Sequence, residues 1–188
     1  MWRWTYLALA TLALALGPRP ALAQTQDPGA ILTAAGLTET DVPRGLALDR
    51  SHSGLRARPD GGQTYTVAFV PDGSGDPAIM GVVNTVEQYP DGASGMDAVA
   101  ERFSAGLGGT RTDLPPPAVG EASRAFTTTR QMMGGAVTAS TAFIVLRRGN
   151  VVASVAVAAM GNTPQTDVAL RLAQDVDRRL AAALTPSS

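Results

Sequence analysis

Residues 136–160, AVTASTAFIVLRRGNVVASVAVAAM, consist of two apolar runs that meet at Gly149-Asn150. Their Val, Ile, Thr and Phe content favours a half-buried strand over a helix. Gly-Asn between two such runs is a signal for a two-residue hairpin turn, because glycine supplies the positive φ that the first turn position needs. The stretch therefore predicts the central hairpin of a sheet, with Arg148 opposite Val151.

This pairing decides which side chains share a face of the predicted sheet. The more apolar face carries Ala142, Ile144, Leu146, Ala153, Val155 and Val157. The opposite face carries Thr141, Phe143, Val145, Ser154, Ala156 and Ala158. We expect helices to cover the first of these faces.

Further strands and helices follow from hydrophobic spacing. Strands are predicted at residues 46–49, 65–70, 79–89 and 122–129, whereas residues 50–62 are expected to form a loop and 110–119 an extended polyproline segment. A short helix is expected after Asp27. Two longer helices are expected, one capped by Ser94 and one that Thr163 caps and Pro164 begins. Short loops between strands predict an α+β fold, an antiparallel sheet of five to six strands with two main helices packed on one face.

The N-terminus has the pattern of a secretory signal. A basic start precedes a twelve-residue apolar run at residues 5–16, which is too short to span a bilayer, and Ala21-Leu22-Ala23 is a small-x-small cleavage site. We predict a signal peptide at residues 1–23 and a single α+β domain at residues 24–188, with an extracytoplasmic location and no stable membrane span after cleavage. An uncleaved signal anchor is the alternative.

Composition excludes several classes of function. The chain has no cysteine and one histidine, so we expect no disulfide, no thiolate chemistry, no metal site and no cofactor. Without residues 1–23, 13 arginines face 16 acidic residues, and the resulting charge of -3 argues against binding to nucleic acid.

Catalytic residues are not recognisable in this sequence. His52 is the one candidate base, and its neighbours Ser51 and Ser53 are too close in sequence to face it as a catalytic triad requires. A hydrolase with a carboxylate pair remains an alternative, although spacing singles out no pair. We expect the protein not to be an enzyme.

Three other segments have a functional and a structural interpretation. The four arginines between residues 44 and 58 could bind an anion, but solvated loop charge is the simpler interpretation. Residues 71–77, PDGSGDP, lack the glycine and the glutamate of a calcium loop and are expected to form a hairpin loop. Met132-Met133 invites a copper(I) hypothesis, yet adjacent strand residues point to opposite faces, which favours packing.

Residues 41–48 (DVPRGLAL), 119–126 (VGEASRAF) and 143–155 (FIVLRRGNVVASV) resemble segments of small secreted bacterial domains of unknown function, which are similar in layout to PsbP-like domains. The chain departs from the lipoprotein members of that group because it has no cysteine to carry a lipid. The resemblance implies an extracytoplasmic binding or accessory domain without an active site.

Two expected helices on one face leave the opposite face without cover. Contiguous exposed apolar surface is uncommon on monomers and usually marks an interaction. We therefore predict that the face of Thr141, Phe143, Val145, Ser154, Ala156 and Ala158 binds a protein partner, a second copy of the chain or a small apolar ligand. A carrier of a small apolar ligand is the alternative to an interaction module.

Overall fold

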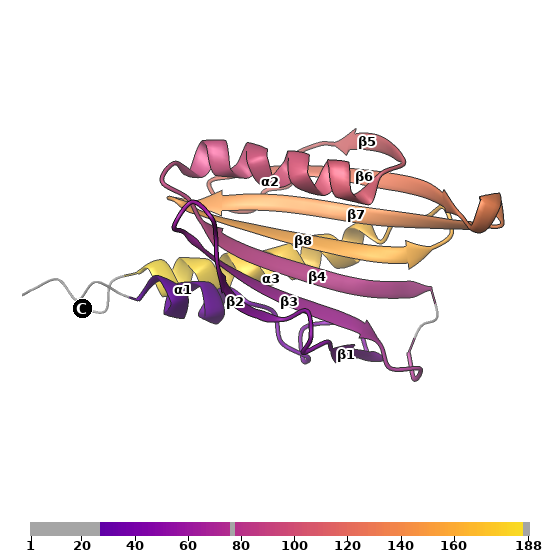
Figure 1. Ribbon diagram of the computed structural model, residues 1–188, viewed down its shortest axis with the longest axis horizontal. Coiled ribbons are helices and arrows are strands. Elements are labelled where there is room, and N and C mark those ends of the chain that lie inside the picture. The colour runs from indigo at the N-terminus through magenta and orange to yellow at the C-terminus, as the bar shows by residue number, and fades with distance from the viewer. Residues whose placement is uncertain (1–26, 76–77, 186–188) are drawn as a thin grey trace, which may run out of the picture.

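The computed structural model describes residues 27–75 and 78–185 (Figure 1). Within those residues the chain forms three α-helices, a 3₁₀ turn and a sheet of eight strands. The helices are α1 (Pro28–Ala35), α2 (Gly92–Leu107) and α3 (Thr166–Leu184), and the 3₁₀ turn is η1 (Met133–Gly135). The strands are β1 (Leu46–Leu48), β2 (Gly54–Ala57), β3 (Gln63–Pro71), β4 (Ile79–Gln88), β5 (Thr110–Leu114), β6 (Ala122–Met132), β7 (Val137–Arg148) and β8 (Val151–Met160). The predicted signal peptide, residues 1–23, lies outside the described residues.

The strands are joined in the order β1-β3-β4-β8-β7-β6-β5, and β2 also pairs with β3. Every pairing is antiparallel. The α+β class and the antiparallel sheet are confirmed, but the expected number of five to six strands is wrong. The strands that sequence analysis missed are β2, in the predicted loop, and β5, in the predicted polyproline segment. Both are short edge strands that pair on one side only, so neither shows the apolar alternation of a half-buried strand.

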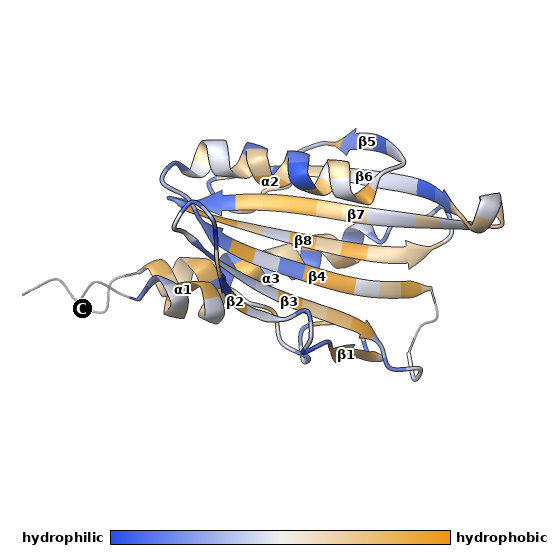
Figure 2. Ribbon diagram, in the orientation of Figure 1, coloured by the Kyte–Doolittle hydropathy of each residue, from blue (hydrophilic) through white to orange (hydrophobic). Residues whose placement is uncertain are grey.

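The central hairpin is confirmed residue by residue. Arg148 pairs with Val151, and Gly149 has a φ of 55°, as the turn requires. The two predicted faces are therefore those of the structure. In Figure 2, β7 is apolar along its middle and hydrophilic at its last residues, where the hairpin turn meets solvent.

The prediction that both main helices pack on one face is wrong. α1 and α3 cover the face of Ile144 and Val155, whereas α2 packs against β6, β7 and β8 on the opposite face. Figure 1 shows the two layers on either side of the sheet. The reason lies in the strand order: β4 and β5 are separated by three strands, and the pairings between them make the two strands parallel. Their connection must cross the intervening strands, and α2 is that crossover.

Each face of the sheet consequently has its own hydrophobic core. The larger core packs α1 and α3 on the sheet, and the buried stripe of α3 consists of Ala169, Leu172, Ala173, Val176 and Leu180. The smaller core lies under α2. At its centre Phe143 packs between Phe103 and Phe126, with ring centroids 4.6 and 4.7 Å apart.

Helix starts are predicted correctly for α1 alone. Asp27 accepts a hydrogen bond from the Gly29 N–H, as expected. α2 is capped by Asp91, not Ser94, because the Asp91 carboxylate accepts from the N–H groups of both Ala93 and Ser94. α3 begins at Thr166, later than the predicted Pro164, and its N-cap residue makes no side-chain cap.

Two arginine–aspartate pairs fasten α3 to the rest of the fold. Arg148 at the end of β7 donates to Asp177, and Arg179 donates to both carboxylate oxygens of Asp41 at 2.7 Å. Burial raises the pKa of Asp41, but hydrogen bonds from Thr38 and Arg179 outweigh it and leave that pKa below its ordinary value. Arg179 therefore belongs to a tertiary contact that joins α3 to the segment before β1. No helix in the described part of the chain is long and apolar enough to cross a membrane.

Candidate functional site

The face of the sheet on which α2 lies is only half covered. α2 packs over β6, β7 and part of β8, and Figure 1 shows β3 and β4 without a helix on that side. We call the uncovered part the open face. By register it consists of Thr66, Ala68, Val70, Gly81, Val83, Thr85, Ala158 and Met160, with Ser154 at the border of α2.

The open face carries no charged side chain, and its exposure to solvent differs from residue to residue. Ala68 is 8% and Thr85 6% exposed although no helix packs over them, whereas Val70 and Met160 at one end are 42% and 43% exposed. The open face thus has small side chains at Ala68 and Ala158, larger ones at Val70 and Met160, and no charge. Such a surface suits an apolar or weakly polar ligand.

The structure brings all six predicted binding residues onto one face but gives them different exposure. Phe143 and Val145 lie buried under α2, and Ser154 is 1% exposed. Thr141 and Ala156 are buried at the border, and Ala158 is half-buried. α2 therefore occupies the part of the face that contains Phe143, and the accessible part lies toward β3 and β4.

Asp49, Ser51 and His52 meet in an exposed turn and superficially resemble a catalytic triad. Asp49 Oδ2 lies 2.6 Å and Ser51 Oγ 3.0 Å from the same ring atom, His52 Nδ1. A triad needs the carboxylate and the hydroxyl on opposite ring nitrogens, so this arrangement cannot relay a proton from the serine. Hydrogen bonds from Ser51 and His52 lower the pKa of Asp49 to about 2, which marks a local charged turn.

We expect His52→Ala to leave the protein's stability almost unchanged, because the histidine side chain is 74% exposed. Surface substitutions of this kind shift the free energy of unfolding by less than about 0.5 kcal/mol. Urea unfolding of both proteins measures this difference. A loss well above that limit would show that the turn supports the adjacent β2 strand.

Glu87 is a buried carboxylate that the sequence analysis did not single out. Its side chain is 1% exposed, and it accepts hydrogen bonds from Arg58, Arg102 and the Tyr89 hydroxyl. Arg58 also lies 3.8 Å over the Tyr89 ring and pairs with Asp60. Burial, followed by the charge of Glu87, raises the pKa of Tyr89. We call these residues the Glu87 cluster. Their hydrogen bonds and ion pairs connect α2 to the sheet, and they leave no acid or base of the cluster free for catalysis.

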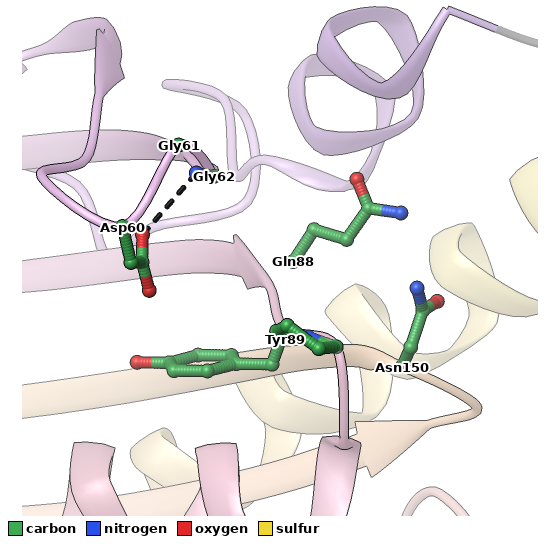
Figure 3. A pocket seen from close by; sticks show the side chains of 7 residues that line it. Asp60, Gly61, Gly62, Gln88, Tyr89 and Asn150 are labelled. Carbon is green, nitrogen blue, oxygen red and sulfur yellow. Dashed lines mark hydrogen bonds between the residues drawn. The ribbon is translucent and has the colours of Figure 1, made fainter.

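A surface pocket of about 270 Å³ adjoins this cluster where three turns meet (Figure 3). Asp60 accepts from the Gly62 N–H at 3.2 Å, and Figure 3 shows the Tyr89 hydroxyl pointing away from Gln88 and Asn150. The ring of Tyr89 is covered by Arg58 and abuts the backbone of Gly95, where an added Cβ would lie 2.4 Å from it. With its aromatic ring and its carboxylate already engaged, this pocket offers a ligand little beyond the side-chain amides of Gln88 and Asn150.

The remaining candidate segments do not assemble into sites. Arg58 is committed to the Glu87 cluster, so the four loop arginines do not converge on an anion. Met133 is 81% exposed in η1 and Met132 ends β6. Among the described residues, no three His, Cys, Asp or Glu side chains are grouped so that they could hold a metal ion.

Comparison with known proteins gives one resemblance in structure. No protein-family model and no curated protein matches the sequence. Among solved structures, the chain is similar to the extracellular domain of PknH from Mycobacterium tuberculosis, with a TM-score of 0.44 and 12% identity over 82% of this chain and 96% of that one. This structural match does not confirm the resemblance to PsbP-like domains.

Proposed function

We propose that the protein is an extracytoplasmic, non-catalytic binding domain whose ligand lies on the open face. The observation that carries this proposal is an uncharged stretch of β3, β4 and β8 that is built mostly from small side chains and over which no helix packs. A surface of this kind buries apolar ligand area without the cost of removing charged groups from water.

One further feature favours binding over catalysis. The two acid or base candidates considered above, Glu87 and His52, lie outside the open face, and each is engaged by its neighbours in an arrangement that moves no proton to a substrate. The secretory pattern of residues 1–23 supports the extracytoplasmic location.

The shape of the open face favours a small ligand over a second copy of the chain. Ala68 and Ala158 have small side chains and Gly81 has none, so this part of the sheet has few projecting groups. A stable dimer buries about 800 Å² on each partner and usually does so with projecting aromatic or long side chains. The described open face has Met160 and Val70 as its large exposed apolar side chains.

Ala158→Arg tests the proposal, because it places a charge in the middle of the open face beside Gly81, which has no side chain to clash with it. The probe is N-phenyl-1-naphthylamine, an uncharged dye that fluoresces in apolar surroundings. Protein produced from Gln24 onward has no tryptophan, so its own emission is low. We expect the dye to bind the unaltered protein and the variant to bind it at least about tenfold more weakly, as an unpaired charge on an apolar surface requires.

Ala118→Arg is the matched control, since Ala118 is exposed in the loop beside α3, on the far side of the sheet. It should bind the dye as the unaltered protein does, and both variants should melt within a few degrees of it. Unchanged dye binding by Ala158→Arg would contradict the proposal. A dimer that binds no dye and dissociates in Ala158→Arg would show that the open face is a contact between copies.

A further inference from the structure

Three hydroxyl groups stand in a row across the open face. Thr66 on β3 is paired with Thr85 on β4, and Thr85 is paired with Ser154 on β8. Neighbouring strands lie about 4.8 Å apart, so the row is about 10 Å long and runs from the β3 side to the border of α2. We call these three residues the hydroxyl row.

The hydroxyl row is not engaged by the protein. Ser154 Oγ is buried and has no hydrogen-bond partner, and within residues 27–75 and 78–185 the hydroxyls of Thr66 and Thr85 make no hydrogen bond either. A buried polar group without a partner is costly, and folded proteins almost always supply one from the chain, from water or from a ligand. The row therefore offers donors and acceptors to a molecule on the open face.

An apolar row lies directly beside it. This apolar row consists of Ala68, Val83 and Ala156, which pair across the same three strands. Each lies two residues from the hydroxyl row on its own strand. The nearest charged groups are Arg56 of the neighbouring strand β2, which donates to the Ser51 carbonyl, and the Glu87 cluster, where Arg58 and Arg102 already pair with Glu87. The part of this surface on β3, β4 and β8 thus presents a line of hydroxyls and a parallel line of small apolar side chains, and it carries no charged group of its own.

We propose that the open face binds an uncharged molecule with an apolar body and a hydroxyl, ester or ketone oxygen, and that this oxygen hydrogen-bonds to the hydroxyl row. This inference rests on the proposed function and names the chemistry of its ligand. A carboxylate beside the hydroxyl row would be removed from water without a cation on β3, β4 or β8 to pair with, since Arg56 of β2 turns toward the Ser51 carbonyl, so the anionic form of such a ligand is disfavoured.

The test is displacement of N-phenyl-1-naphthylamine by three molecules with the same chain length: dodecan-1-ol, methyl dodecanoate and dodecanoate, each below its micelle-forming concentration at neutral pH. We expect the alcohol and the ester to displace the dye at concentrations about tenfold lower than dodecanoate, because the anion loses its hydration on an uncharged surface. Equal displacement by dodecanoate would overturn the inference.

A double variant, Thr85→Val with Ser154→Ala, removes two hydroxyls while almost preserving shape. Its affinity for the alcohol and the ester should fall about tenfold, as expected when a hydrogen bond to a ligand is lost, and its affinity for the dye should stay within about twofold. Ser140→Ala is the matched control, because Ser140 Oγ is likewise buried without a partner but lies on the face that α3 covers. It should leave all affinities unchanged.

The outcomes separate this inference from the proposed function. Dye binding that Ala158→Arg abolishes, with no preference for the uncharged molecules, would keep the proposed function and reject the ligand class. No dye binding by the unaltered protein would reject both. In the ligand-free protein Ser154→Ala should melt at the same or a higher temperature, and a marked decrease would show that the hydroxyl already has a partner and would overturn the inference.

Discussion

Phe143→Arg is expected to prevent folding. Phe143 is 1% exposed and packs between Phe103 of α2 and Phe126 of β6, so it joins the helix to the sheet. Removing a buried phenylalanine side chain costs about 3–5 kcal/mol, and an unpaired charge in its place adds further to that loss. Because a domain of this size has only about 5–15 kcal/mol of stability, most of it is lost. Circular dichroism and urea unfolding measure the effect.

Met160→Arg is the control for Phe143→Arg, since Met160 is 43% exposed on the same side of the sheet. It should fold normally and change the free energy of unfolding by less than about 1 kcal/mol. A Phe143→Arg protein with native stability would show that α2 does not pack on the sheet in solution. Phe143 would then be exposed and available for binding, as the sequence predicts.

The second large effect is expected for Glu87→Gln, which removes one charge and almost no volume. Arg58, whose side chain is 15% exposed, and Arg102 would then lie beside an uncharged amide. Breaking a buried ion pair by neutralising one partner costs about 3–5 kcal/mol, and the lower value applies here because Arg102 can turn toward solvent. Urea unfolding should show a loss of about 3 kcal/mol.

Glu101→Gln is the same substitution at an exposed carboxylate of α2. Glu101 is 78% exposed and lies 3.9 Å from Arg111, so its loss should cost less than about 1 kcal/mol. Equal effects of the two substitutions would mean that the Glu87 cluster contributes no more than a surface pair.

Local patterns were sufficient for the elements that are buried along their length. The hairpin follows from Gly149-Asn150 between two β-rich runs, and α3 follows from a stripe of apolar residues at helical spacing. In both cases side chains within one segment determine the element, so no knowledge of the rest of the fold is required. The edge strands β2 and β5 lacked such a pattern because each meets the sheet on one side only.

The position of α2 could not be predicted from its own residues. Its apolar stripe predicts that it packs on a sheet, but the face depends on the strand to which the chain returns. If the chain after α2 had formed a strand next to β4, α2 could have packed on the same face as α3. The chain instead forms β5, so α2 has to cross β8, β7 and β6. The error about Phe143 follows directly from this non-local feature.

The proposed site and the binding face that the sequence predicts overlap in part. Ala158 belongs to the open face and Ser154 adjoins it, whereas Phe143 and Val145 lie under α2. The Glu87 cluster was missed because its partners Arg58 and Arg102 lie in segments far apart in the sequence. A signal was present, since a lone glutamate in the apolar run IMGVVNTVEQY requires a cation if it is to be buried.

The arrangement of β1 and β2 along β3 has a consequence for aggregation. The two strands of 3 and 4 residues together occupy the outer side of β3, and between them Ser53 Oγ accepts from the Ala68 N–H while the Asp49 N–H donates to the Ala68 carbonyl. At the other end of the sheet, β5 has 5 residues and runs into Pro115–Pro117, which have no N–H to donate. Neither end of the sheet offers a long row of free backbone groups on which another chain could add a strand. Within the described residues, such short and interrupted edges disfavour fibre-like growth at high concentration.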